Sequence, residues 1–253
     1  MEPSSYDLAD PQTHLRALVR ARGDLTGTIS TWWFTGSIHG VVGDDVRLLC
    51  GFESASVLKL VPRPDDAFDL TLTELPFYLD PATGATLDRL TNPFNGVVCE
   101  PPGGATRMPS ALLTSSGMAV PEITPVPLAI KSRMFPAVLD GDDVHLCDHS
   151  NASIAGGGDT AAFFADELAT YQVSLQDLKN PALTSVPARA HLRVLMSPFA
   201  WLEMSDLGGH VLGQVTGRKV VSAADLPETV VTRALGSSTP GFLGDPASFL
   251  DRP

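Results

Sequence analysis

Hydrophobic and polar positions alternate with a period of two along much of the chain, which is typical of β-strands. Strand segments are predicted over residues 26–42, 46–60, 68–79, 188–197 and 209–221, and in the first of these both faces carry aromatic residues. Glycine, proline and aspartate gather between these segments, as they do in turns. The order of segments lacks the regular strand–helix alternation of a doubly wound sheet. The pattern therefore predicts many short antiparallel strands.

Helical patterns occur near both ends of the chain. Residues 8–22 form an amphipathic helical segment with Asp10 as its expected N-cap, and residues 225–235 predict a second helix with Asp225 as N-cap. Residues 101–127 are rich in proline, glycine and serine and show little periodicity, so a long loop is expected there.

The expected fold class is mainly β. No repeat or shift in composition divides residues 1–253, so we expect a single domain. Closing a sheet is the natural way to bury this many short strands. We therefore expect an antiparallel barrel, or a strongly curved sheet, around an apolar cavity with short peripheral helices. A hairpin turn is expected at residues 140–143, whereas the pattern over residues 160–169 leaves helix and strand open.

Charge and composition limit the function classes. The 253 residues include 17 Lys+Arg and 29 Asp+Glu, a formal net charge of −12 that argues against a general nucleic-acid or anionic-membrane surface. No apolar run reaches the roughly 18 residues of a membrane span, and the first residues lack the pattern of a secretion signal. We expect no membrane association and a cytoplasmic location.

Cofactor motifs are absent from the sequence. It contains no GxGxxG and no GxxxxGK[ST], so no nucleotide cofactor is expected. The cysteines, Cys50, Cys99 and Cys147, lie far apart and form no CxxC pair. Neither a disulfide framework nor a structural zinc site is therefore expected.

Candidate acid–base residues come from strand periodicity. Glu74 and Tyr78 share the apolar side of segment 68–79, and His39 lies in segment 26–42. If these two segments line one interior, the three side chains converge, and burial shifts the pKa values of glutamate and histidine toward acid–base use. We assign His39, Glu74 and Tyr78 as candidate catalytic residues. The alternative, structural roles at a strand end and a turn, stays open.

Candidate substrate-binding residues are Trp33, Tyr171, His191 and Trp201. Trp201 is the centre of an aromatic and methionine cluster over residues 197–204, which suits either a pocket wall or ordinary core packing. His191 alternates with apolar residues, so it faces either the interior or the solvated outer side of its strand.

The densest group of metal-ligand residue types is His145, Cys147, Asp148 and His149. On a helix His145 and His149 would share a face, but on a strand they lie too far apart to chelate easily. The preceding turn favours a strand or loop, and hence a polar strand end without a metal. A metal-dependent hydrolase using His145, Asp148 and His149 is kept as an alternative.

Three blocks of sequence resemble the family of domain of unknown function number 1838. They run from Asp10 into the Trp32–Trp33 strand, from Phe77 to Gly96, and from Ser197 to Glu228. The chain departs from the family pattern in having Leu90 before the Asn-Pro pair. The resemblance implies a bacterial or fungal protein, often found near catabolic or secondary-metabolite enzymes. It implies no established activity and no catalytic residues.

These observations favour a cofactor-independent enzyme. Lyase, isomerase or hydratase chemistry on a small hydrophobic molecule, aromatic or terpenoid-like, needs only an acid, a base and a dry pocket. A non-catalytic lipocalin-like carrier of such a molecule is the main alternative. Whether the chain forms a homo-oligomer stays open.

Overall fold

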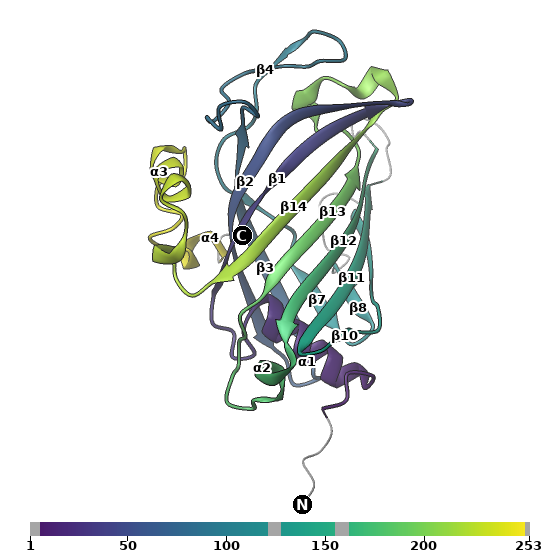
Figure 1. Cartoon of the computed structure of the whole chain (residues 1–253), viewed down its shortest axis with the longest axis vertical. Helices are drawn as coiled ribbons and strands as arrows, with labels where there is room; N and C mark the ends of the chain where they lie inside the picture. The colour runs from purple at the N-terminus through teal and green to yellow at the C-terminus, as the bar shows by residue number, and fades with distance from the viewer. Residues whose placement is uncertain (1–5, 121–127, 155–161, 251–253) are drawn as a thin grey trace, which may run out of the picture.

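Antiparallel strands dominate the computed structural model, which describes residues 6–120, 128–154 and 162–250 (Figure 1). The first strands are β1 (Ser30–Val42), β2 (Asp45–Pro62), β3 (Phe68–Leu79), β4 (Leu90–Thr91), β5 (Val98–Cys99), β6 (Thr106–Arg107), β7 (Ala111–Thr114) and β8 (Gly117–Ala119). They are followed by β9 (Leu128–Met134), β10 (Val138–Asp140), β11 (Asp143–Ile154), β12 (Phe163–Ser174), β13 (Arg189–Met196) and β14 (His210–Val220). The helices are α1 (Pro11–Arg22), α2 (Leu175–Lys179), α3 (Glu228–Gly236) and α4 (Ala247–Leu250), with single 3₁₀ turns at Ala200–Leu202, Ser205–Leu207 and Ala223–Asp225.

The main sheet follows the order β10-β11-β12-β13-β14-β1-β2-β3-β7-β8, with β9 paired to β11 and β6 to β3. It curls into a nearly closed barrel, which confirms the expected fold class (Figure 1). The two ends of the curl meet at β8 and β9. Gly117 of β8 has φ +124°, and a Cβ atom there would lie 2.2 Å from the carbonyl oxygen of Ser132 in β9. Only glycine allows this close approach of the two strands.

Helix α1 closes one end of the barrel. Its apolar side chains, Leu15, Leu18 and Val19, are almost completely buried in a cluster with Trp32 and Tyr171 from the barrel wall. Burying each of these aliphatic side chains stabilises the fold by about 2 kcal/mol. The helix therefore acts as a hydrophobic plug.

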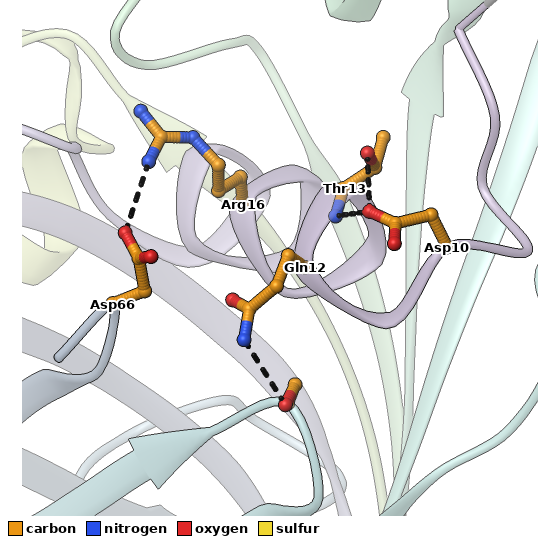
Figure 2. A network of polar contacts seen from close by, with 6 residues as sticks. Asp10, Gln12, Thr13, Arg16 and Asp66 are labelled. Atoms are coloured by element: carbon orange, nitrogen blue, oxygen red, sulfur yellow. Dashed lines mark hydrogen bonds and ion pairs between the residues drawn. The ribbon is translucent and has the colours of Figure 1, made fainter.

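Polar contacts hold α1 across the barrel end (Figure 2). Asp10 caps the helix by accepting a hydrogen bond from the backbone N–H of Thr13 at 2.7 Å, as the sequence predicted. Gln12 donates to Ser115 in the β7–β8 turn at 3.3 Å, and Arg16 forms an ion pair with Asp66 in the β2–β3 turn (Figure 2). The plug is thus tied to two turns of the barrel rim.

The other end of α1 is held from inside the fold. The ammonium group of Lys219 in β14 donates to the carbonyl oxygens of Arg20 and Gly23 at 2.6 and 3.1 Å. Burial lowers the pKa of Lys219 to about 7, although the nearby carboxylate of Asp24 opposes this shift. The cation lies where the helix dipole favours positive charge.

Helices α3 and α4 cover the outside of the barrel beside β2 (Figure 1). Glu53 in β2 accepts a hydrogen bond from the indole N–H of Trp33 at 3.0 Å, and Arg233 of α3 pairs with the same carboxylate. Arg218 stacks over the Trp33 ring. This outer contact, rather than the barrel interior, holds α3 in place.

Local predictions differ from the structure in three places. The segment 101–127 contains β6, β7 and β8 in its described part, because strands of two to four residues are too short to show periodicity. Strand β12 begins at Phe163 and so includes residues 163–169, where the pattern left helix and strand open. Asp225 is not the N-cap of a helix. It is the last residue of a 3₁₀ turn whose N-cap is Ser222, and its carboxylate accepts from the Ser222 backbone, while α3 begins after Pro227.

Candidate functional site

The strand registers decide which side chains point into the barrel. Phe34 is aligned with Gly217 of β14, which is aligned in turn with Ala190 of β13 and Tyr171 of β12. Side chains in one such row share a face of the sheet. Because Tyr171 belongs to the buried cluster beneath α1, this face is the interior.

The same registers place four acidic and phenolic groups inside. Glu74 is aligned with Ser56 and hence with Trp32, while Tyr78 is aligned with Phe52 and hence with Gly36. Through the successive strand pairings Glu167 is aligned with Ile38, and Asp148 is aligned with Gly36. The barrel interior thus carries carboxyl groups from three different strands, β3, β11 and β12.

Arg22 lies among these carboxyl groups. Its guanidinium forms an ion pair with Asp148 at 3.5 Å, and it also lies 5.6 Å from the centre of the Tyr171 ring. Ser132 of β9 donates to the other oxygen of Asp148 at 2.6 Å. Burial opposes the guanidinium charge, but the neighbouring acidic groups more than offset it and raise the pKa of Arg22. Arg22, the last residue of α1, therefore places a positive charge inside the barrel at the end that α1 closes.

Glu167 is an inward carboxyl group with a strongly raised pKa. Burial raises its pKa to about 7; the Arg22 charge opposes this shift, whereas the charges of Asp148 and Glu74 add to it. Near neutral pH the carboxyl group is thus divided between its protonated and ionised forms. A group in this state can both donate and accept a proton.

Glu74 and Tyr78 are placed together, as the sequence predicted. Ser54 donates to Glu74 Oε1 at 2.8 Å and Ser56 does so at 3.4 Å, yet burial outweighs these bonds and raises the pKa of Glu74. Burial, reinforced by the Glu74 charge, also raises the pKa of Tyr78. Tyr78 therefore keeps its proton throughout the physiological range.

An aromatic cluster surrounds Tyr78. The ring centre of Trp201 lies 5.0 Å from that of Tyr78, and Phe199 stacks on Trp201 at 6.0 Å. Phe52 contacts Tyr78 edge-on at 6.2 Å. The side chain of Asn92 donates to the carbonyl oxygen of Leu202 at 2.7 Å, so the segment that follows β4 holds the Trp201 turn over this cluster.

Several inward side chains between the plug and this cluster are only partly buried. Side chains next to α1, such as Leu146 and Ala190, are fully buried. Farther along the barrel, Glu167, Leu192 and Val194 point inward but keep surface that water can reach. The inward side chains here are mainly apolar with a few polar groups, which is the composition of small-molecule sites.

Three predicted site residues lie outside the barrel. His39 is aligned with Leu212 on the outward face and does not approach Glu74 or Tyr78. His191, aligned with Thr216, is exposed on the outer side of β13. Trp33 packs beneath α3. The alternating pattern of a strand does not show which face is inside, and in β1 both faces are covered.

The candidate metal ligands point in different directions. Asp148 faces inward, whereas His145 and His149 lie on the outward face of β11. His149 is instead within 3.0 Å of Asp166 on the neighbouring strand, and this pair lowers the pKa of Asp166. Among the described residues no group of three or more histidine, cysteine, aspartate or glutamate side chains has the geometry for a metal ion.

Sequence reasoning missed Glu167 and Arg22. Ala165, Glu167, Ala169, Tyr171 and Val173 form one side of β12, and a glutamate on this apolar side is the available signal. The pattern over residues 160–169 does not distinguish helix from strand, so it does not place Glu167 on an apolar face. For Arg22, the last residue of α1, no signal in the sequence shows that the helix end enters the barrel.

Comparisons with known proteins match part of the chain to one family model. Residues 27–100 match the model of the family described as protein of unknown function (DUF1838). The match confirms the resemblance over the Trp32–Trp33 strand and the block from Phe77 to Gly96. No curated protein and no solved structure matches the chain. In the described part of the chain, no helix has the length and apolar character needed to span a membrane.

Proposed function

We propose that this protein is a cofactor-independent enzyme that carries out acid–base chemistry on a small, mainly apolar molecule inside its barrel. The reaction is of lyase, isomerase or hydratase type. The observation that carries the proposal is Glu167, an inward carboxyl group whose pKa burial raises to about 7. Perturbed carboxyl groups within a concave apolar interior are characteristic of catalytic sites.

Glu167 acts as the general acid or base in this proposal. A pKa near the working pH gives substantial populations of both protonation states, which is the condition for efficient proton transfer. Glu74 lies close enough for its charge to raise the pKa of Glu167, and the hydroxyl groups of Ser54 and Ser56 orient it. Glu74 is therefore the second proton-transfer group.

Tyr78 and Tyr171 supply hydrogen-bond donors. Burial raises the pKa of Tyr171 to about 12, so it stays protonated and can donate to an oxygen atom of the substrate. Phe34, Leu192 and Val194 offer apolar contact between the plug and Tyr78, and Trp201 adjoins Tyr78 as a pocket wall. These surroundings favour an aromatic or terpenoid-like skeleton over a sugar or nucleotide.

A lipocalin-like carrier is the alternative, because a barrel closed at one end by a helix and lined by apolar side chains also suits simple retention of a ligand. A carrier needs no proton transfer. It would therefore bind its ligand equally well after Glu167 is replaced by glutamine, which has nearly the same shape.

The experiment is an untargeted assay in deuterated water. A metabolite extract is incubated with the wild-type protein, and mass spectrometry identifies compounds that gain deuterium or gain or lose water. The same extract is incubated with Glu167→Gln and Glu74→Gln. We expect each variant to slow the change by at least about a hundredfold, the usual contribution of a general acid or base.

Two control variants locate the effect. His39→Ala removes an outward histidine, and Asp166→Asn removes the outward carboxylate next to Glu167 in sequence. Both are expected to retain wild-type rates. If the wild-type protein changes no compound, or if Glu167→Gln works as fast as wild type, the enzymatic proposal is wrong. Retention of a bound compound in native mass spectrometry by both wild type and Glu167→Gln, without turnover, would instead establish a carrier.

A further inference from the structure

A cavity lies at the plugged end of the barrel, outside the interior described above. It has a volume of about 570 Å³ and lies between the residues leading into α1, the helix itself and the connection from β9 to β10. Its walls include Tyr6, Leu8, Met134, Phe135, Ala137 and Leu139. Because these residues are mostly apolar, the cavity favours a mainly apolar ligand.

His14 of α1 provides the polar feature of this cavity. His14 is one of the lining residues, only 7% of it is exposed, and its buried Nε2 atom has no hydrogen-bond partner among the described residues. Buried polar atoms are nearly always paired, so an unpaired one calls for an explanation. A ligand group that satisfies Nε2 is such an explanation.

The chemistry of His14 defines what the ligand must offer. Burial lowers the pKa of His14, against an opposing contribution from the Leu8 backbone, so the ring is neutral at neutral pH. Since only Nε2 lacks a partner, the Leu8 contact is assigned to Nδ1. A neutral imidazole that donates from Nδ1 has only an acceptor at Nε2. The ligand must therefore carry a donor such as a hydroxyl group. Because Nε2 is buried, this contact requires a tilt of the ring edge toward the cavity.

Charge disfavours an anionic ligand in this cavity. Asp7 is one of the lining residues, and the chain has a net charge of −12. The nearby polar contacts of α1 are already made within the protein, since Gln12 donates to Ser115 and Arg16 pairs with Asp66 (Figure 2). These groups hold the helix and leave His14 as the recognition group.

We propose that the cavity beside His14 binds a small, neutral, mainly apolar molecule that carries a hydroxyl group, with His14 Nε2 accepting its hydrogen bond. The proposal concerns a binding site separate from the barrel interior. It therefore stands or falls independently of the acid–base chemistry assigned to Glu167.

The test measures binding of 2-naphthol, an apolar aromatic alcohol, by its fluorescence at about pH 8, where His14 is neutral. Naphthalene has the same skeleton without the hydroxyl group. We expect 2-naphthol to bind the wild-type protein and to bind His14→Phe roughly two- to tenfold more weakly, the range of a single neutral hydrogen bond. Naphthalene should bind wild type and His14→Phe equally.

Two further variants distinguish this cavity from other sites. Ala9→Trp introduces a large side chain at an exposed position on the cavity lining and should abolish 2-naphthol binding. His191→Phe makes the same substitution at an exposed outer position and should change nothing. The proposal is overturned if wild type does not bind 2-naphthol, if Ala9→Trp binds it normally, or if His14→Phe binds it as tightly as wild type. Ala9→Trp decides the location of the site even if His14→Phe does not fold.

Discussion

Replacing Glu167 with glutamine should make the protein more stable at neutral and alkaline pH. Burial raises the pKa of this carboxyl group to about 7 in the folded protein, against an ordinary value of 4.5. Glutamine has nearly the same shape but cannot ionise, so the substitution removes the cost of a buried negative charge.

The sign and size follow from proton linkage. Between pH 4.5 and 7 the folded state holds a proton that the unfolded state has lost, so stability falls as pH rises through this window. The difference in pKa corresponds to about 3 kcal/mol. This is an upper limit, since the side chain keeps some contact with water. Above about pH 7 the wild-type protein carries the whole cost.

Urea unfolding at a series of pH values from about 4 to 8 measures the effect. The free energies of unfolding of wild type and Glu167→Gln should agree at the acidic end, and the variant should gain up to about 3 kcal/mol by pH 8. Asp166→Asn is the matched control, because it removes a carboxylate from the outward face of the same strand. Since its contact with His149 lowers the pKa of Asp166, this control should not become more stable as pH rises.

Parallel pH profiles of wild type and Glu167→Gln would refute the reasoning. They would mean that Glu167 ionises in the folded protein as it does in the unfolded chain. The assignment of Glu167 as a proton-transfer group near neutral pH would then be wrong as well. The catalytic proposal and the stability prediction therefore share one physical premise, which this measurement tests without a known substrate.

Three other predictions concern the fold. In thermal denaturation, Gly117→Ala should lower the free energy of unfolding by about 2 kcal/mol or more beyond the loss caused by Gly43→Ala. A Cβ atom at Gly117 meets Ser132, whereas Gly43 has a positive φ and open space around it. Equal losses would show that β8 and β9 do not meet there. The stability of the wild-type protein should rise between about pH 8 and 10, because the pKa of Lys219 is about 7 in the folded protein and 10.5 ordinarily, so that only the unfolded state holds the proton in this range. Lys219→Met should remove this rise. A flat wild-type profile would contradict the prediction. In urea unfolding, Arg233→Met should destabilise the protein by about 2 kcal/mol, because it leaves Glu53 buried without its cation. The double variant Glu53→Gln with Arg233→Met should lose less stability than the sum of the two single variants. Simple additivity would show that the pair is not coupled.

Much of the fold could be predicted because strand periodicity is local. The bounds of β3, Phe68 and Leu79, agree with the predicted segment 68–79. The strand continues through Pro76, which pairs with Ser54 on one side only, since β6 and β7 accompany β3 no farther than Glu74. A proline is tolerated at such an edge because it has no N–H to donate.

The candidate site could be predicted only in part. Glu74 and Tyr78 were found because a polar residue on the apolar side of a strand is visible in the sequence. His39 was placed wrongly, since both faces of β1 are covered, the outer one partly by α3. The period of two divides the side chains of a strand between two faces of the sheet, but it does not show which face points into the barrel.

The sequence by itself determined the strand and helix periods, the cap at Asp10, the acidic balance and the absence of nucleotide motifs. These are properties of neighbouring residues or of composition. Only the tertiary structure decided that Arg22 meets Asp148 and that Glu167 lies near Glu74. Contacts of this kind join segments more than a hundred residues apart in some cases, and they depend on how far each strand is shifted against the next around the barrel. The pKa of Glu167 follows from that closure, because a carboxyl group loses its water only when the sheet curls around it.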